Sequence, residues 1–296
     1  MAWEGYRFYC LWVERPGEGV DPEREQAKRR VAFESWLAGV QHNALALPES
    51  EFEVWLENPN LLEGYYVSDN IKIRHPEEIE AYRDGSVPVV HDVSSENVWA
   101  RVDTLRLMIL KRSVEELRGV DGLRKVAYFD GDVDLDNCAD ELSAMVDERL
   151  QLYGVAAGCA NVKLNKGEIE AGGSLENGFM ASMVDGKFID DHLPEILSEV
   201  NEAYALNLRK DYGNKMGMNT VYDIYYEHLR RYASNMGIPH HIWEKRMGGV
   251  PIQPPSGKKF QRDISVIKKE DHALWASERR EIDPCLVEEL ETTVSP

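Results

Sequence analysis

Residues 126–135 constrain this chain most, because an apolar run passes directly into a row of acids. The segment reads VAYFDGDVDL. Four apolar or aromatic residues are too few for a typical helix and predict a short buried strand. Asp130 and Asp132 follow at its carboxyl end, the edge at which open α/β sheets bind ligands. Residues i and i+2 of a strand point to the same side, so both carboxylates would face one ligand if the extended backbone continues that far.

The acidic pair suggests a bound cation. Two adjacent carboxylates repel each other, and burying them costs free energy unless a cation accompanies them. A divalent, oxygen-binding metal is the natural partner, with a substrate phosphate completing its coordination. The plain alternative is a strand that ends in an acidic, solvated turn, and these ten residues alone do not separate the two interpretations.

Strand-like and helix-like segments alternate along the 296 residues, which predicts an α/β fold with a mostly parallel central sheet and helical additions. Strands are expected at 6–13, 52–56, 71–73, 126–129 and 155–162. Helices are expected at 23–37, 76–83, 95–112, 139–152, 188–206 and 221–236. With no internal repeat and no clean linker, 1–296 is predicted to form a single domain.

Local composition refines this outline. In the first helix, Val31 and Phe33 are expected on the inner face. The glycine-rich, charged segment 163–173 and the Gly/Pro/Ser-rich segment 248–257 are expected to be loops. Residues 258–296 are a candidate C-terminal lid and tail.

The net charge of the chain limits the classes of binding partner to expect. Lys and Arg number 34 against 53 Asp and Glu, a formal net charge of −19. Nucleic-acid-binding proteins usually need a basic face, and the same acidic excess disfavours anionic membranes. No apolar run is long enough to span a bilayer, and the first residues lack the pattern of a signal peptide. The four cysteines form no Cys-x-x-Cys pair, so a reducing cytoplasm is the expected location.

Two chemistries fit the acids in part. The acids at 130, 132, 134, 136 and 141 have the spacing of a calcium-binding EF-hand loop, but Leu135 stands where that loop needs glycine. Asp130-Gly131-Asp132-Val133 also resembles the nucleophile motif of haloacid-dehalogenase-like phosphatases. There Asp130 would attack phosphorus and Asp132 would act as acid and base. That motif usually opens its domain, whereas 129 residues precede it here.

A third interpretation explains more of the chain. Asp103 and Arg106 lie one helical turn apart upstream of the acids, so they share a helix face. Together with Tyr128-Phe129-Asp130-Gly131-Asp132 they resemble the Asp-x-x-Arg … Tyr-x-Asp-x-Asp signature of DXD glycosyltransferases. That group includes the glycosyltransferase domains of large clostridial toxins and related mannosyltransferase-like enzymes. Lys125-Val126-Ala127 departs from the glycine pair that usually precedes the tyrosine.

The resemblance implies a GT-A-like fold, transfer of a sugar from a nucleoside diphosphate sugar, retention of configuration, and Mn²⁺ or Mg²⁺ as cofactor. UDP is the expected carrier. The implied catalytic residues are Arg106, Asp130, Asp132 and Asn177. The implied donor-binding residues are Trp12, Asp103, Arg106, Tyr128, Asp130, Asn177 and Trp275. The implied metal ligands are Asp130, Asp132, Glu270 and His272.

Each implied role has a plain structural alternative. Trp12 would stack on the base, or be a core aromatic. Asp103 would bind ribose or sugar hydroxyls and Arg106 would pair with Asp130 or the sugar, or the two would form only a surface salt bridge. Trp275 would close a lid over the donor, or pack a terminal helix. A non-catalytic nucleotide-sugar or calcium binder also remains open, and the acceptor can be a protein, a glycan or a small molecule.

Overall fold

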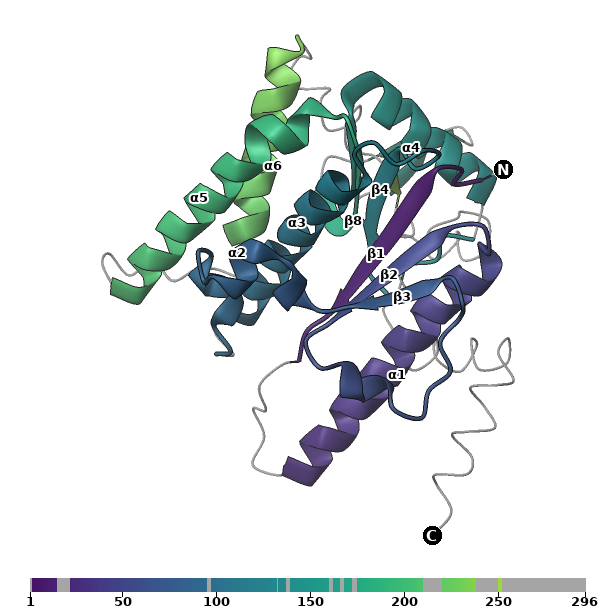
Figure 1. Ribbon diagram of the computed structural model, residues 1–296. Helices are drawn as coiled ribbons and strands as arrows, with labels where there is room; N and C mark the ends of the chain where they lie inside the picture. Colours follow the sequence, from purple (N-terminus) through teal and green to yellow (C-terminus); the bar gives the residue numbers. More distant parts are fainter. Residues whose placement is uncertain are drawn as a thin grey trace.

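A computed structural model describes residues 2–14, 22–94, 97–131, 133–136, 139–159, 162–165, 168–171, 175–209, 220–237 and 250–251. A central sheet is covered by helices on both faces (Figure 1). The strands of this sheet are β1 (Tyr6–Trp12), β2 (Glu51–Leu56), β3 (Ile71–Arg74), β4 (Lys125–Phe129), β5 (Val155–Cys159), β8 (Leu175–Met183) and β9 (Val250–Pro251). Two further strands, β6 (Val162–Asn165) and β7 (Glu168–Ala171), form a hairpin.

The helices alternate with the strands along the chain. They are α1 (Pro22–Ala46), α2 (Glu80–Arg83), α3 (Val98–Leu117), α4 (Ala139–Tyr153), α5 (Lys187–Arg209) and α6 (Thr220–Asn235). Three short 3₁₀ turns, η1 (Pro59–Leu62), η2 (Pro76–Glu78) and η3 (Pro88–His91), lie between β2 and α3. In the part of the chain described, no helix is long and apolar enough to cross a membrane.

The central sheet has the strand order β3-β2-β1-β4-β8-β5-β9. Strands β3, β2, β1 and β4 are mutually parallel, and β5 is parallel to β9. Strand β8 is antiparallel to both of its neighbours, with Phe129 of β4 opposite Phe179. The predicted α/β fold with a mostly parallel sheet is therefore confirmed.

Side chains of each central strand alternate between two apolar cores. In β4, Val126 and Tyr128 join the core under α3, α5 and α6, while Ala127 and Phe129 join the core under α1 and α4. Because both faces are covered, nearly every residue of the strand is apolar, which explains the unbroken run in the sequence. The carboxyl end of β4 thus opens between two helical layers.

Two local expectations need correction. The first helix runs to Ala46, because Val40 and Ala44 continue its buried stripe, while Val31 is 55 % exposed rather than inside. The expected loop at 163–173 contains the β6–β7 hairpin, with Asn165 opposite Glu168. The loop was predicted from the glycine content of this segment, and that composition gave no sign of two short strands that pair with each other. The segments 252–296, including the candidate lid, lie outside the described residues.

Candidate functional site

An arginine on α3 organises the carboxyl end of β4. The Arg106 guanidinium contacts Asp103 Oδ1 at 3.0 Å, one turn back on the same helix, and Asp130 Oδ1 at 2.7 Å, just beyond β4. The Tyr128 hydroxyl donates to the same Asp130 oxygen. The Arg106 guanidinium also lies 4.8 Å from the centre of the Tyr128 ring, which suits a cation–π contact. The four residues therefore form one cluster, here called the Arg106 cluster.

Burial sharpens the electrostatics of the Arg106 cluster. Both Asp103 and Arg106 are buried, and Asp130 is nearly so. Burial works against the charge of Arg106, but Asp130, Tyr128 and Asp103 outweigh it and raise the pKa of the guanidinium. Burial, reinforced by Asp130, also raises the pKa of the Tyr128 hydroxyl, so it stays protonated and remains a donor. The cluster thus holds a fixed positive group between two acids.

One polar atom of the Arg106 cluster has no counterpart. Among the described residues, the Arg106 Nε is buried without a hydrogen-bond partner. A small cavity of about 10 Å³ beside it is lined by Asp103, Met180, Tyr222 and Tyr225, among others. That volume holds about one water molecule. Buried donors are nearly always satisfied, so this nitrogen marks a place where a polar group from a ligand or water fits.

An aromatic cluster lies on the other side of the same strand ends. Residue Trp12 closes β1, and its ring centre is 5.5 Å from Trp36 and 5.4 Å from Phe33, both on α1. Trp12 and Trp36 are half-buried. A methyl group added at Gly131 would lie only 2.3 Å from Trp36 Cδ1, so this ring rests directly on the Asp130-Gly131 backbone. Glycine is required at 131 by that close approach.

The turn after β4 is held by hydrogen bonds to the neighbouring strand β8 and to helix α1. The Asp130 amide donates to Gly178 O of β8 at 2.8 Å. From α1, the Asn43 side chain donates to Val133 O and accepts from the Leu135 amide, both at 2.8 Å. Sequence reasoning missed Asn43, although a polar residue on the inner stripe of a helix is a signal for such a clamp. Leu135 is buried and β4 precedes the acids, which rules out an EF-hand.

The structure brings together five of the predicted site residues: Asp103, Arg106, Tyr128 and Asp130 form the cluster, and Trp12 lies at the end of neighbouring β1. Residue Asn177 belongs to β8, next to the Gly178 that binds the Asp130 amide, but its side chain is not described. The remaining predicted site residues, Asp132, Glu270, His272 and Trp275, lie outside the described residues. A separate cleft of about 460 Å³ between α2 and α3 contains none of the predicted site residues.

No protein-family model and no curated protein sequence matches this chain. Solved structures with a similar course of the chain include one described as a transferase, at 14 % identity and a TM-score of 0.44, covering 84 % of this chain and 91 % of that one. Mouse xyloside xylosyltransferase 1 has 10 % identity and a TM-score of 0.40, covering 90 % and 97 %. The galactosyltransferase LgtC, solved with donor and acceptor sugar analogues, has 13 % identity and a TM-score of 0.39, covering 98 % and 97 %. Identities of 10–14 % and TM-scores of 0.39–0.44 assign no function to this chain.

Proposed function

We propose that this chain is a metal-dependent glycosyltransferase that moves a sugar from a nucleoside diphosphate sugar, with UDP as the expected carrier and with retention of configuration. The observation that carries the proposal is the Arg106–Asp130 ion pair at the carboxyl end of β4, two residues before Asp132. Ligands of α/β sheets bind beyond such strand ends. The acceptor is left open.

The Arg106 cluster would bind the sugar and ribose hydroxyls of the donor. Carboxylate oxygens accept hydrogen bonds from hydroxyl groups, and Asp103 and Asp130 are held in place by Arg106 and Tyr128 before any ligand arrives. Groups fixed in this way lose little freedom on binding and are strongest where charge develops in a reaction.

The aromatic cluster would hold the nucleotide base. Trp12 and Trp36 are large rings at the same edge as Asp130, and both remain partly exposed. Base stacking on an aromatic side chain contributes about 1–3 kcal/mol and tolerates different bases. The base and the sugar would therefore lie on opposite sides of the Asp130-Gly131 turn, with the diphosphate between them.

The residues present fit a hard divalent cation. The candidate donors at the turn are carboxylate oxygens, which Mn²⁺ and Mg²⁺ prefer. Because Asp130 Oδ1 is taken by Arg106 and Tyr128, Asp132 is assigned as the direct ligand, and Asp130 as a ribose or water-mediated contact. When bound, such an ion neutralises the diphosphate as it leaves. From the C-terminal segment, Glu270 or His272 would add a ligand, and Trp275 would cover the donor.

Donor hydrolysis by the purified full-length chain tests the proposal. With Mn²⁺ and no acceptor, UDP-sugars should release UDP and free sugar slowly. Arg106→Met should lower that rate about 100-fold, as expected for losing a preorganised charged donor. Arg112→Met is the matched control, since Arg112 is a half-exposed arginine of the same helix paired at the surface with Glu116. Its rate should equal that of the unaltered chain.

Two results would contradict the proposal. Release of phosphate from an aryl phosphate, with beryllofluoride trapped on Asp130, would identify a phosphatase. The geometry disfavours this, because the contacts of Arg106 and Tyr128 with Oδ1 stabilise the ionised Asp130 carboxylate and make it a weaker nucleophile. Tight binding of a donor with no turnover in any cell extract would identify a non-catalytic binder.

A further inference from the structure

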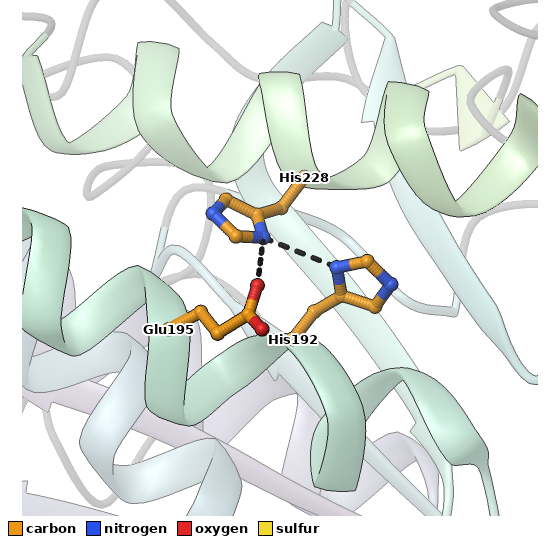
Figure 2. Close-up of side chains that lie close together, drawn as sticks. All are labelled: His192, Glu195 and His228. Carbon is orange, nitrogen blue, oxygen red and sulfur yellow. Dashed lines mark hydrogen bonds and ion pairs between the residues drawn. The ribbon is translucent and has the colours of Figure 1, made fainter.

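Three metal-ligating side chains meet between α5 and α6, away from the end of β4 (Figure 2). His192 and Glu195 lie on one face of α5, and His228 faces them from α6. The His192 and His228 Nδ1 atoms are 3.1 Å apart, and His228 Nδ1 is 3.9 Å from Glu195 Oε2. Atoms bound tetrahedrally to Zn²⁺ at about 2.0–2.1 Å lie about 3.3 Å from one another. The distance between the two histidine nitrogens is therefore close to that of a zinc site, and all three ligand atoms lie within 4.8 Å of one another.

A second carboxylate fixes the tautomer of His228. On the far side of the ring, His228 Nε2 lies 3.1 Å from Glu199 Oε1. An ionised carboxylate only accepts hydrogen bonds, so Nε2 carries the hydrogen and Nδ1 of the neutral ring presents its lone pair. That lone pair faces His192 and Glu195. A histidine that donates to a carboxylate through one nitrogen and binds metal through the other is the usual arrangement in zinc proteins.

The surroundings of the cluster suit an ion that is half covered. His228 is 0 % exposed, and the His192 ring stacks on buried Phe188 at 5.3 Å. Glu195 is 65 % exposed, so water can reach the cluster from that side and complete the coordination. One cation lies close by, because Arg231 contacts Glu199 at 3.3 Å, but Arg231 is half-exposed and is held on the far side of His228.

We propose that His192, His228 and Glu195 bind one divalent cation of the zinc class and that this ion ties α6 to α5. Imidazole nitrogen suits Zn²⁺, whereas Mn²⁺ and Mg²⁺ prefer oxygen, so this site differs in chemistry from the acidic turn after β4. One to two turns before His228, α6 carries Val221 and Tyr225, which line the cavity beside Arg106. Occupancy of the metal site would thereby also hold one wall of that cavity.

The test uses the full-length chain stripped with a chelator and titrated with Zn²⁺ or Co²⁺ in the absence of nucleotide. Zinc should raise the melting temperature, because it binds only the folded state. Cobalt should give the intense visible absorption of a nitrogen-ligated, four-coordinate ion. Glu195→Gln should weaken zinc binding at least about tenfold, and Glu199→Gln about 10–100-fold through the ring it orients. Both residues are surface-accessible, so these variants are expected to fold.

The matched control is Glu202→Gln, which removes the same charge from an exposed position on the same helix and should leave zinc binding unchanged. His192→Gln should abolish the cobalt spectrum. Zinc binding that persists undiminished in Glu195→Gln and His192→Gln would place the ion elsewhere and overturn the proposal. Absence of any zinc effect would also overturn it, leaving two imidazoles that share one hydrogen bond. Neither result depends on the sugar-transfer proposal, because no donor is present.

Discussion

Two buried arginines of this protein, Arg74 and Arg106, have similar surroundings. The Arg74 guanidinium lies 4.9 Å from the ring centre of Trp55 and contacts Glu53 at 2.8 Å and Glu116 at 3.2 Å. Glu53 belongs to β2 and Glu116 to α3. The Arg74 guanidinium also contacts Glu78 at 2.6 Å, and Arg7 approaches Glu53 at 3.4 Å.

The second arginine, Arg106, repeats that plan. It lies over the ring of a strand residue, Tyr128, and joins one acid beyond a strand, Asp130, to one acid of α3, Asp103. The two arginines differ in whether every buried polar atom of the guanidinium has a hydrogen-bond partner. Within the described part of the chain, Arg106 keeps a buried Nε without a partner, and no such atom occurs on Arg74.

This difference separates a structural network from one that is ready for a ligand. Around Arg74, a third carboxylate and a second arginine join the network, and within the described residues no buried polar atom of Arg74 lacks a partner. Around Arg106, the network ends at a strand terminus beside a small cavity. The same residue types thus stabilise the fold in one place and remain available to bind in the other, and position in the sheet decides which.

Replacing each arginine by methionine should separate the two roles. Arg74→Met leaves Glu53, 2 % exposed, as a buried charge without its main counter-ion, and should lower the free energy of unfolding by about 3–5 kcal/mol. The folded fraction should keep its donor hydrolysis rate. Arg106→Met should cost less stability, about 1–3 kcal/mol, because the strand end lets water reach Asp130, and it should lower turnover about 100-fold. Denaturant unfolding and UDP release, measured on both variants, make this comparison. Equal losses of turnover in the two variants would show that Arg74 and Arg106 do not have separate structural and ligand-binding roles.

A methyl group at Gly131 would disturb the Arg106 side alone. Its carbon would lie 2.3 Å from Cδ1 and 2.7 Å from Nε1 of Trp36. The Trp36 ring also contacts the rings of Phe33 and Trp12, so it has little room to move away. Gly131→Ala should therefore cost about 1–3 kcal/mol through overpacking. It should also weaken nucleotide binding, measured by isothermal titration with UDP and Mn²⁺.

Shrinking the opposing ring is the control for Gly131→Ala. In a Trp36→Leu background the added methyl group has room, so the second substitution should cost little further stability. If Gly131→Ala costs the same in both backgrounds, the close approach of Trp36 is not its cause. The cycle is informative because the two side chains touch, and contacting residues are where additivity fails.

Sequence reasoning anticipated the Arg106 cluster because its signals are local. Asp103 and Arg106 are one helical turn apart, and Asp130 follows Tyr128 by two residues at the end of β4, so two simple periodicities pair them. The alternation of strands and helices likewise predicted the sheet. Asp132 was predicted from its place just after an apolar strand, and the C-terminal residues were predicted by resemblance; all of them stay predictions.

The Arg74 network could not be found in this way. Its members come from five elements, and Glu53 stands in an apolar strand where nothing local shows that it faces α3 rather than solvent. The His192–His228 pair is hidden for the same reason, since 36 residues separate its members. Contacts between distant elements are set by tertiary packing and do not appear as a periodic pattern in the sequence. For the same reason, Val31 was wrongly predicted to lie on the inner face of α1.

A third polar group, centred on Asp92, extends the comparison to an accessible site. Asp92 accepts from the Ser94 amide at 2.9 Å, from Asn97 at 2.7 Å and from the Tyr204 hydroxyl of α5 at 3.0 Å. Burial raises the pKa of the Asp92 carboxyl, but these hydrogen bonds outweigh it and hold the pKa below its usual value. In turn, burial and the hydrogen bond to Asp92 raise the pKa of Tyr204 to about 12.

Asp92→Asn should therefore have the smallest effect and the clearest pH dependence. A carboxyl whose folded pKa is lowered stabilises the protein fully above its unfolded pKa of about 3.9, and the contribution disappears as pH falls through the folded pKa. The variant should be less stable by about 1 kcal/mol or less at neutral pH, since the site is half-exposed and asparagine keeps one acceptor. The stability gap, measured by urea unfolding, should narrow below about pH 4 and close in stronger acid.

Asp84→Asn is the control, because exposed Asp84 makes the same turn with Ser86 without the other two bonds. A gap of the same size there would assign the effect to the turn and not to the contact with α5, whereas a gap that widens in acid would show that the folded protein favours the protonated form of Asp92.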